Sequence, residues 1–162
     1  MLLTDYVTYD GVRAALGVAP EELEDTTLAL KLYVDVLQVE LEDIDLTLPD
    51  LYTTTKAVPT PTAPESRFLQ SAQLFATYVV ARHLLGSISL FAPKDITDGK
   101  TATARVGDPY RELRADIQAQ YDRFKARLEA TFEALTSTTV TTAVTKSYFA
   151  IASPSTDPVT GV

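Results

Sequence analysis

The sequence predicts a mainly α-helical fold: a small antiparallel bundle of three long helices and a short N-terminal one, followed by an extended C-terminal arm. Three observations predict this fold. Apolar residues recur at intervals of three and four in three long segments, segments rich in Pro or Gly separate these, and an almost uncharged Ser/Thr/Val stretch follows the last one. At 162 residues, the chain has the length of one domain with one core. We expect a helical body at residues 1–135 and an interaction arm at residues 136–162.

The sequence of the N-terminal part predicts a short helix and then a long one. Thr8 is a candidate N-cap for a helix that ends near Leu16, because Gly17 is a typical helix stop. Asp25 is a candidate N-cap for the long helix. One apolar stripe of that helix comprises Leu30, Val34, Leu37, Leu41 and Ile44, and a second comprises Leu28, Leu32, Val36 and Val39. Because two adjacent stripes are apolar, we expect this helix to be packed on two sides.

Prolines predict a long connection after this helix. Pro49 is expected to end the helix, and the Pro-rich run at residues 58–64 does not fit inside one. We therefore expect a loop at residues 45–62.

The central helix is expected to begin after this loop. Thr62 and Glu65 have the spacing of a capping box, and the apolar pattern continues to about Leu85. This segment is apolar around most of its circumference, so we expect it at the centre of the bundle or in a subunit interface. Pro93 ends it. A hairpin-like segment is expected at residues 93–107, with a short turn or hairpin near 94–106.

The last helix has the clearest pattern. Asp108-Pro109 reads as a cap followed by the first helical residue. The apolar positions that then repeat at intervals of three and four are Tyr110, Leu113, Ile117, Tyr121, Phe124, Leu128, Phe132 and Leu135. The opposite face carries charges of both signs, and we expect it to be solvated or to face a neighbour.

The arm differs sharply from the body in composition. Eight of the twelve residues from Thr136 to Ser147 are Ser or Thr, and the aromatic pair Tyr148-Phe149 follows them. Such a segment has little material for a core of its own, so we expect it either to be a disordered terminus or to bind a partner. The candidate partner-binding residues are Val140, Val144, Tyr148, Phe149 and Ile151.

Acidic residues are concentrated at the N-terminal end. The formal charge of the chain is −8, and residues 1–50 hold twelve acidic and two basic residues, a balance of −10. Tight sequence-specific nucleic-acid binding needs a basic face, so this balance argues against a DNA-binding domain. Two interpretations stay open for the acidic residues near the end of the long helix: ordinary solvated residues, or a channel-facing surface that repels passing DNA. These residues are Glu40, Glu42, Asp43 and Asp45.

No residue pattern in the sequence points to catalysis, a cofactor or a metal. The chain has no cysteine, which excludes disulfides and thiolate metal sites. It has one histidine, His83. The phosphate-binding loop, the Gly-x-Ser-x-Gly elbow, the dinucleotide motif and the EF-hand loop are also missing. We therefore expect a protein that is not an enzyme. Neither a signal peptide nor a membrane span is expected.

Three features of the body point to a known family. They are the opening segment Tyr6–Gly17, the segment Pro20–Leu28 that leads into a long helix, and the turn-containing segment Asp95–Lys100 after a central apolar helix. Together they resemble the head-tail connector family of tailed bacteriophages, the adaptor or head-completion proteins that dock beneath the portal ring. The resemblance covers most of the body. The Pro-rich run at 58–64 and the Thr-rich tract are not matched residue by residue.

The resemblance implies a structural virion protein of the head-tail junction, assembled in the host cytoplasm. Such a protomer repeats as a homo-oligomeric ring, usually a dodecamer, and its C-terminal arm contacts the portal protein and neighbouring copies. A tail or nozzle protein would bind the far side, and DNA would pass nearby without sequence-specific binding. No cofactor and no membrane are implied. Two other classes stay open: a tail completion or stopper protein, and a generic helical protein-protein interaction module.

Overall fold

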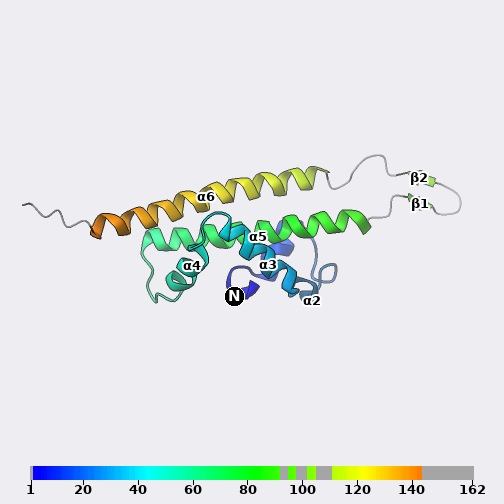
Figure 1. Cartoon of the computed structure of the whole chain (residues 1–162). Coiled ribbons are helices and arrows are strands. Elements are labelled where there is room, and N and C mark those ends of the chain that lie inside the picture. Colours follow the sequence, from blue (N-terminus) through cyan, green and yellow to red (C-terminus); the bar gives the residue numbers. More distant parts are fainter. Residues whose placement is uncertain (1, 92–94, 98–101, 105–110, 144–162) are drawn as a thin grey trace, which may run out of the picture.

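The computed structural model describes residues 2–91, 95–97, 102–104 and 111–143, with side chains placed in 2–86 and 111–137. It is mainly helical, which confirms the predicted fold class. The elements in chain order are a 3-10 helix η1 (Leu3–Asp5), α1 (Tyr9–Leu16), α2 (Asp25–Leu28), α3 (Lys31–Glu42), α4 (Leu48–Lys56), α5 (Ala63–Phe91), β1 (Asp95–Thr97), β2 (Ala102–Ala104) and α6 (Arg111–Ala143). Helix α6 runs along one side of α5, and the shorter helices lie on the other side (Figure 1).

Helix α1 has the two caps that the sequence predicts. The hydroxyl of Thr8 accepts a hydrogen bond from the Gly11 N–H at 3.1 Å, which satisfies one free donor of the first turn. Gly17 follows the last turn with φ 69°, a left-handed conformation that glycine adopts without a steric penalty. The short helix therefore begins and ends where its cap residues place it.

The long helix expected from Asp25 is interrupted. Asp25 begins the short helix α2, and α3 starts only at Lys31. The buried side chain of Arg13 holds the start of α2, because its Nε donates to the Leu23 carbonyl at 2.9 Å and its guanidinium also contacts the Asp25 carboxylate. These contacts fasten the segment between α1 and α2 to α1 and fix Asp25 at the first residue of α2.

The loop expected at residues 45–62 is wrong for residues 48–56, which form α4. Pro49 sits in the first turn of α4, where its missing N–H costs nothing, so it helps to start a helix and does not end one. Leu48, Tyr52 and Thr55 are buried at spacings of four and three. The Tyr52 ring stacks on Tyr6 with centroids 3.9 Å apart, which fastens α4 to the N-terminal segment.

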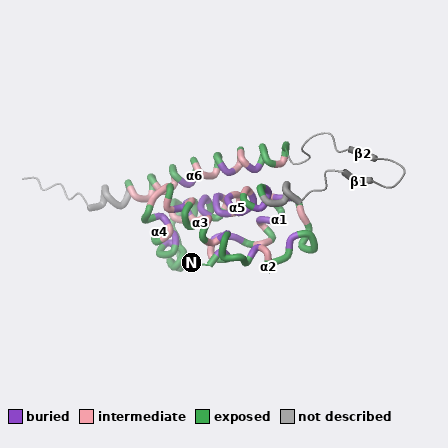
Figure 2. The backbone as a smooth tube through the Cα atoms, turned by 45° about the vertical axis from the view of Figure 1, so that its right-hand side comes forward, coloured by how far each residue is buried: buried purple, intermediate pink, exposed green. Residues whose placement is uncertain are grey.

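Helix α5 is the centre of the bundle, as expected. Thr62 and Glu65 form the predicted N-terminal contact: the Glu65 carboxylate accepts from the Thr62 N–H at 2.6 Å and from its hydroxyl at 2.7 Å, which lowers the pKa of Glu65. Buried positions occur around most of the helix (Figure 2). The fully buried side chains of α5 include Phe68, Ala72, Phe75, Ala76 and Val79.

Helices α5 and α6 form a long antiparallel pair. Phe68 packs near Phe132 with ring centroids 6.4 Å apart, whereas Phe75, further along α5, packs near Tyr121 at 5.4 Å, earlier on α6. The described part of the connection contains an antiparallel strand pair in the register Asp95↔Ala104, Ile96↔Thr103 and Thr97↔Ala102. This pair lies within the segment where the sequence predicts a turn or hairpin.

Helix α6 continues beyond the expected boundary at residue 135, so the beginning of the predicted arm is helical. The hydroxyl of Thr136 donates to the Phe132 carbonyl one turn earlier at 3.0 Å, which satisfies the hydroxyl within the helix. Because the propensity cost of Thr is only a few tenths of a kcal/mol, a helix already packed on α5 can extend through such residues. Val140 therefore lies on α6, and the other four candidate arm residues, Val144, Tyr148, Phe149 and Ile151, fall outside the described residues.

Candidate interaction surface

The four acidic candidates near the end of α3 do not form one surface. Glu40 is largely enclosed, with its side chain 19% exposed, and it joins three helices. The Tyr121 hydroxyl on α6 donates to Glu40 Oε2 at 2.5 Å, and Arg82 Nη1 on α5 lies 3.8 Å from Glu40 Oε1. The guanidinium of Arg82 also lies over the Tyr121 ring, 4.4 Å from its centroid. Glu40 is thus a structural group, which corrects its predicted place on an open acidic surface.

The Tyr121 hydroxyl remains a donor over a wide pH range. Burial raises the pKa of Tyr121 to about 12, and the hydrogen bond to Glu40 acts in the same direction. The neutral phenol therefore keeps its proton and donates a hydrogen bond to the Glu40 carboxylate at physiological pH. This contact connects α3 to α6 across 81 residues of sequence, and no local sequence pattern indicates it.

The other three acidic candidates differ from one another. Glu42 accepts a hydrogen bond from the Gln38 side chain at 2.7 Å on the outer side of α3. Asp43 is exposed. Asp45 accepts from the Thr47 N–H at 2.8 Å and from the Thr47 hydroxyl at 2.6 Å, and these bonds lower the pKa of Asp45. Asp45 therefore shapes the turn before α4, and only Glu42 and Asp43 remain candidates for an external acidic surface.

The second predicted apolar stripe is exposed only in part, because Leu28 is fully buried on α2 and Val36 is half-buried against the core. We call its part on α3 the α3 stripe and define it as Leu32, Val36 and Val39. Leu32 is 61% exposed and Val39 is 56% exposed, whereas Leu37 and Leu41 on the first stripe are fully buried. The expectation that this helix is packed on two sides holds in part: Leu28 and Val36 of the second stripe pack against the core, whereas Leu32 and Val39 are more than half exposed. A hollow of about 310 Å³ lies beside the stripe, lined by Asp35, Val36, Val39, Glu40 and His83.

The outward side of α6 is a second uncovered face. Four alanines lie along its middle, and the acidic residues Asp122 and Glu133 lie among them. All six are exposed: Ala115, Ala119, Asp122, Ala126, Ala130 and Glu133. Arg123 and Arg127 lie one turn apart on one edge of this row, and both are exposed. Neither guanidinium forms an ion pair with any residue that the structure describes. We call the side formed by these alanines, acidic residues and arginines the α6 face, and its charges are mixed in sign.

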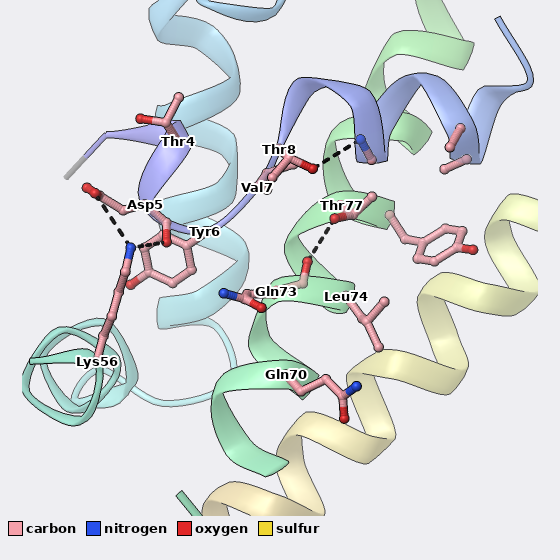
Figure 3. A pocket seen from close by; sticks show the side chains of 14 residues that line it. Thr4, Asp5, Tyr6, Val7, Thr8, Lys56, Gln70, Gln73, Leu74 and Thr77 are labelled. Atoms are coloured by element: carbon pink, nitrogen blue, oxygen red, sulfur yellow. Dashed lines mark hydrogen bonds and ion pairs between the residues drawn. The ribbon is translucent and has the colours of Figure 1, made fainter. Parts of the chain in front are cut away.

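A groove runs between the N-terminal segment and α5 (Figure 3). It has a volume of about 590 Å³ and is lined on the α5 side by Gln70, Gln73, Leu74 and Thr77. Lys56 lies at one end, where its Nζ donates to the Asp5 carbonyl at 2.6 Å. The lining offers amides and hydroxyls, groups that hold a peptide or solvent by hydrogen bonds.

Among the residues that the structure describes, we looked for groups that could hold a metal ion or transfer a proton. No group of three or more His, Asp or Glu side chains is arranged there to hold a metal ion. Burial raises the pKa of Tyr6 beside the groove, which moves this phenol further from proton transfer at neutral pH. In the described segments, no helix combines the length and apolar character needed to cross a bilayer.

Comparisons with models of protein families, with curated proteins and with solved structures give no match.

Proposed function

We propose that this chain is a structural virion protein, a head-tail adaptor that forms a ring beneath the portal of a tailed bacteriophage and continues the DNA channel. The proposal begins from the sequence resemblance of the segments Tyr6–Gly17, Pro20–Leu28 and Asp95–Lys100. One structural observation supports it most: a single subunit has two different uncovered faces, the apolar α3 stripe and the α6 face. A subunit that repeats around a ring needs two such faces.

The proposed arm is shorter than the sequence suggests. Because α6 extends to Ala143, the portal-binding segment begins after that residue, and Val140 belongs to the helix that carries it. In the proposal, Val144, Tyr148, Phe149 and Ile151 insert into pockets of the portal or of a neighbouring copy. Aromatic side chains are suited to this role because they bury a large area at a small entropic cost.

The charge distribution fits a protein past which DNA moves. Residues 1–50 carry a balance of −10, and Glu42 and Asp43 lie on the outer part of α3. Acidic groups disfavour adhesion to phosphates, so DNA would slide past without sequence-specific binding. In this account the protein resides at the head-tail junction of the virion and is assembled in the host cytoplasm, with a tail or nozzle protein on its far side.

Co-sedimentation with the portal ring encoded in the same genome tests the proposal. The full chain and a version ending at Ala143, which keeps all of α6, are compared over a range of concentrations. We expect the full chain to bind at a fixed ratio and the shortened chain to bind much more weakly. Equal binding of both would place docking on the body and remove the proposed role of the arm. Absence of binding by either would contradict the adaptor assignment and favour a stopper protein or a helical interaction module.

A further inference from the structure

The groove between the N-terminal segment and α5 is suited to an extended polypeptide. Val7 and Thr8 line one side of it, and Gln73 and Leu74 line the other (Figure 3). Thr8 has extended backbone angles, with φ −94° and ψ 140°. Its N–H and the Val7 carbonyl form no hydrogen bond with any residue that the structure describes. Free main-chain groups on an extended segment can pair with the main chain of a peptide laid beside them.

The charge of the groove restricts the kind of occupant. Among the described residues that line it, only Asp5 and Lys56 are charged, and they contact each other. The Lys56 Nζ lies 3.8 Å from Asp5 Oδ1 and donates to the Asp5 carbonyl at 2.6 Å. A nucleic acid would find no basic surface here, so the groove favours an uncharged segment. Residues 147–156 of this chain are such a segment, because none of the ten is charged.

The C-terminal arm begins at the end of the bundle from which this groove is within reach. Because α5 and α6 are antiparallel, with Phe132 near Phe68, the end of α6 lies beyond the start of α5 (Figure 1). Ala143 follows Phe132 by eleven residues, a rise of about 16 Å. The α5 side of the groove, Gln70–Thr77, lies about 3–14 Å from Phe68 in the other direction. About six to nine extended residues span this return path of roughly 20–30 Å, so residues from Ala150 onward can reach the groove.

We propose that residues 150–156 dock in the groove of their own chain while no partner is bound, with Ile151 against Leu74 and their main chain beside Val7 and Thr8. The tether favours the groove of the same chain, because a short linker gives an effective concentration in the millimolar range and a modest affinity then suffices. The portal and the groove compete for the arm, so the arm is released on docking. This inference rests on the proposed function only for the identity of the competing partner.

The absence of cysteine from the chain permits a direct test with engineered cysteine pairs. Full-length Gln70→Cys with Ala150→Cys is oxidised at low protein concentration, and the products are separated on a non-reducing gel. In the control, Ala130→Cys replaces Gln70→Cys; Ala130 is exposed on α6 and lies two residues before Phe132, as Gln70 lies two after Phe68. We expect an intrachain disulfide that forms about tenfold faster than in the control. Equal rates, or a disulfide mainly between two chains, would overturn the inference.

Filling the groove provides the second measurement. Thr77→Arg, added to the Gln70→Cys, Ala150→Cys chain, places a long charged side chain in the groove and should slow the disulfide to the rate of the control. Thr131→Arg is the matched substitution outside the groove and should leave the rate unchanged. Both threonines are half-buried, and each hydroxyl donates to the carbonyl four residues earlier, at 2.9 Å for Thr77 and 3.0 Å for Thr131. Equal slowing by both substitutions would overturn the inference.

The two proposals fail in different ways. Portal binding without the intrachain disulfide would leave the adaptor assignment standing and refute the groove contact. The intrachain disulfide without portal binding would support the groove contact and refute the adaptor assignment. Where both are found, the portal ring should slow the disulfide, and an unchanged rate would refute the competition for the arm.

Discussion

Removal of the Tyr121 hydroxyl tests the contact that connects α3 to the α5–α6 pair. Tyr121→Phe deletes the donor that lies 2.5 Å from Glu40 Oε2 and leaves the ring in its place over Phe75 and Arg82. A hydrogen bond to a charged group contributes about 1.5–3 kcal/mol. Glu40 is 19% exposed and keeps Arg82 nearby, so the lower end applies. We expect the free energy of unfolding to fall by about 1.5 kcal/mol.

A double-mutant cycle separates this bond from other effects. Glu40→Gln keeps an acceptor but removes the charge, and we expect its combination with Tyr121→Phe to show a coupling energy of about 1 kcal/mol. Urea denaturation followed by circular dichroism measures each variant. Tyr33→Phe is the matched control, because Tyr33 is buried to a similar degree and its hydroxyl has no hydrogen bond within the described part of the chain. A loss in Tyr121→Phe no larger than in Tyr33→Phe would refute the reasoning.

Three further predictions concern the core, a cap and pH. Phe75→Ala is expected to lower the free energy of unfolding by about 3–5 kcal/mol, because the side chain is fully buried between α5 and α6; a loss below about 1 kcal/mol in urea denaturation would contradict the central position of α5. Gly17→Ala should destabilise the protein by about 1 kcal/mol, because the φ angle of Gly17 is 69°. Gly86→Ala, inside α5 with open space at its Cβ, should stabilise the protein by a similar amount. Thermal unfolding measures both changes and distinguishes their signs. The raised pKa of Tyr121 favours the neutral phenol in the folded state, so its stabilisation is present below pH 10 and is lost as the pH rises toward 12. Denaturation across this range should show a steeper loss of stability in the native protein than in Tyr121→Phe, and identical slopes would count against the shift.

Local patterns predict the elements whose signals lie within a few residues. The Thr8 and Gly17 caps of α1 and the Thr62–Glu65 start of α5 are found where the sequence places them. Each signal acts through a hydrogen bond or a backbone conformation at the helix end itself, so the surrounding fold does not alter it. The long apolar repeat of α6 is equally reliable because it is sustained over many turns.

The role of a residue cannot be predicted from local sequence where it depends on contacts with residues far away in the chain. Pro49 is compatible with the end of one helix and with the start of another, and the stacking of Tyr6 on Tyr52 decides between them. Glu40 reads as a surface acid until Arg82 and Tyr121 are brought to it by tertiary packing. Periodicity likewise identifies the α3 stripe as apolar but does not say whether its cover comes from the same chain or from a partner.

The mass of the complex formed with the portal ring tests the central claim most directly. Native mass spectrometry of the full chain mixed with purified portal ring counts how many copies are bound. The adaptor account predicts one saturated species, with a fixed ratio of this chain to portal subunits. A portal mass that stays unchanged at saturating protein, or a spread of complexes with no preferred ratio, would contradict the account.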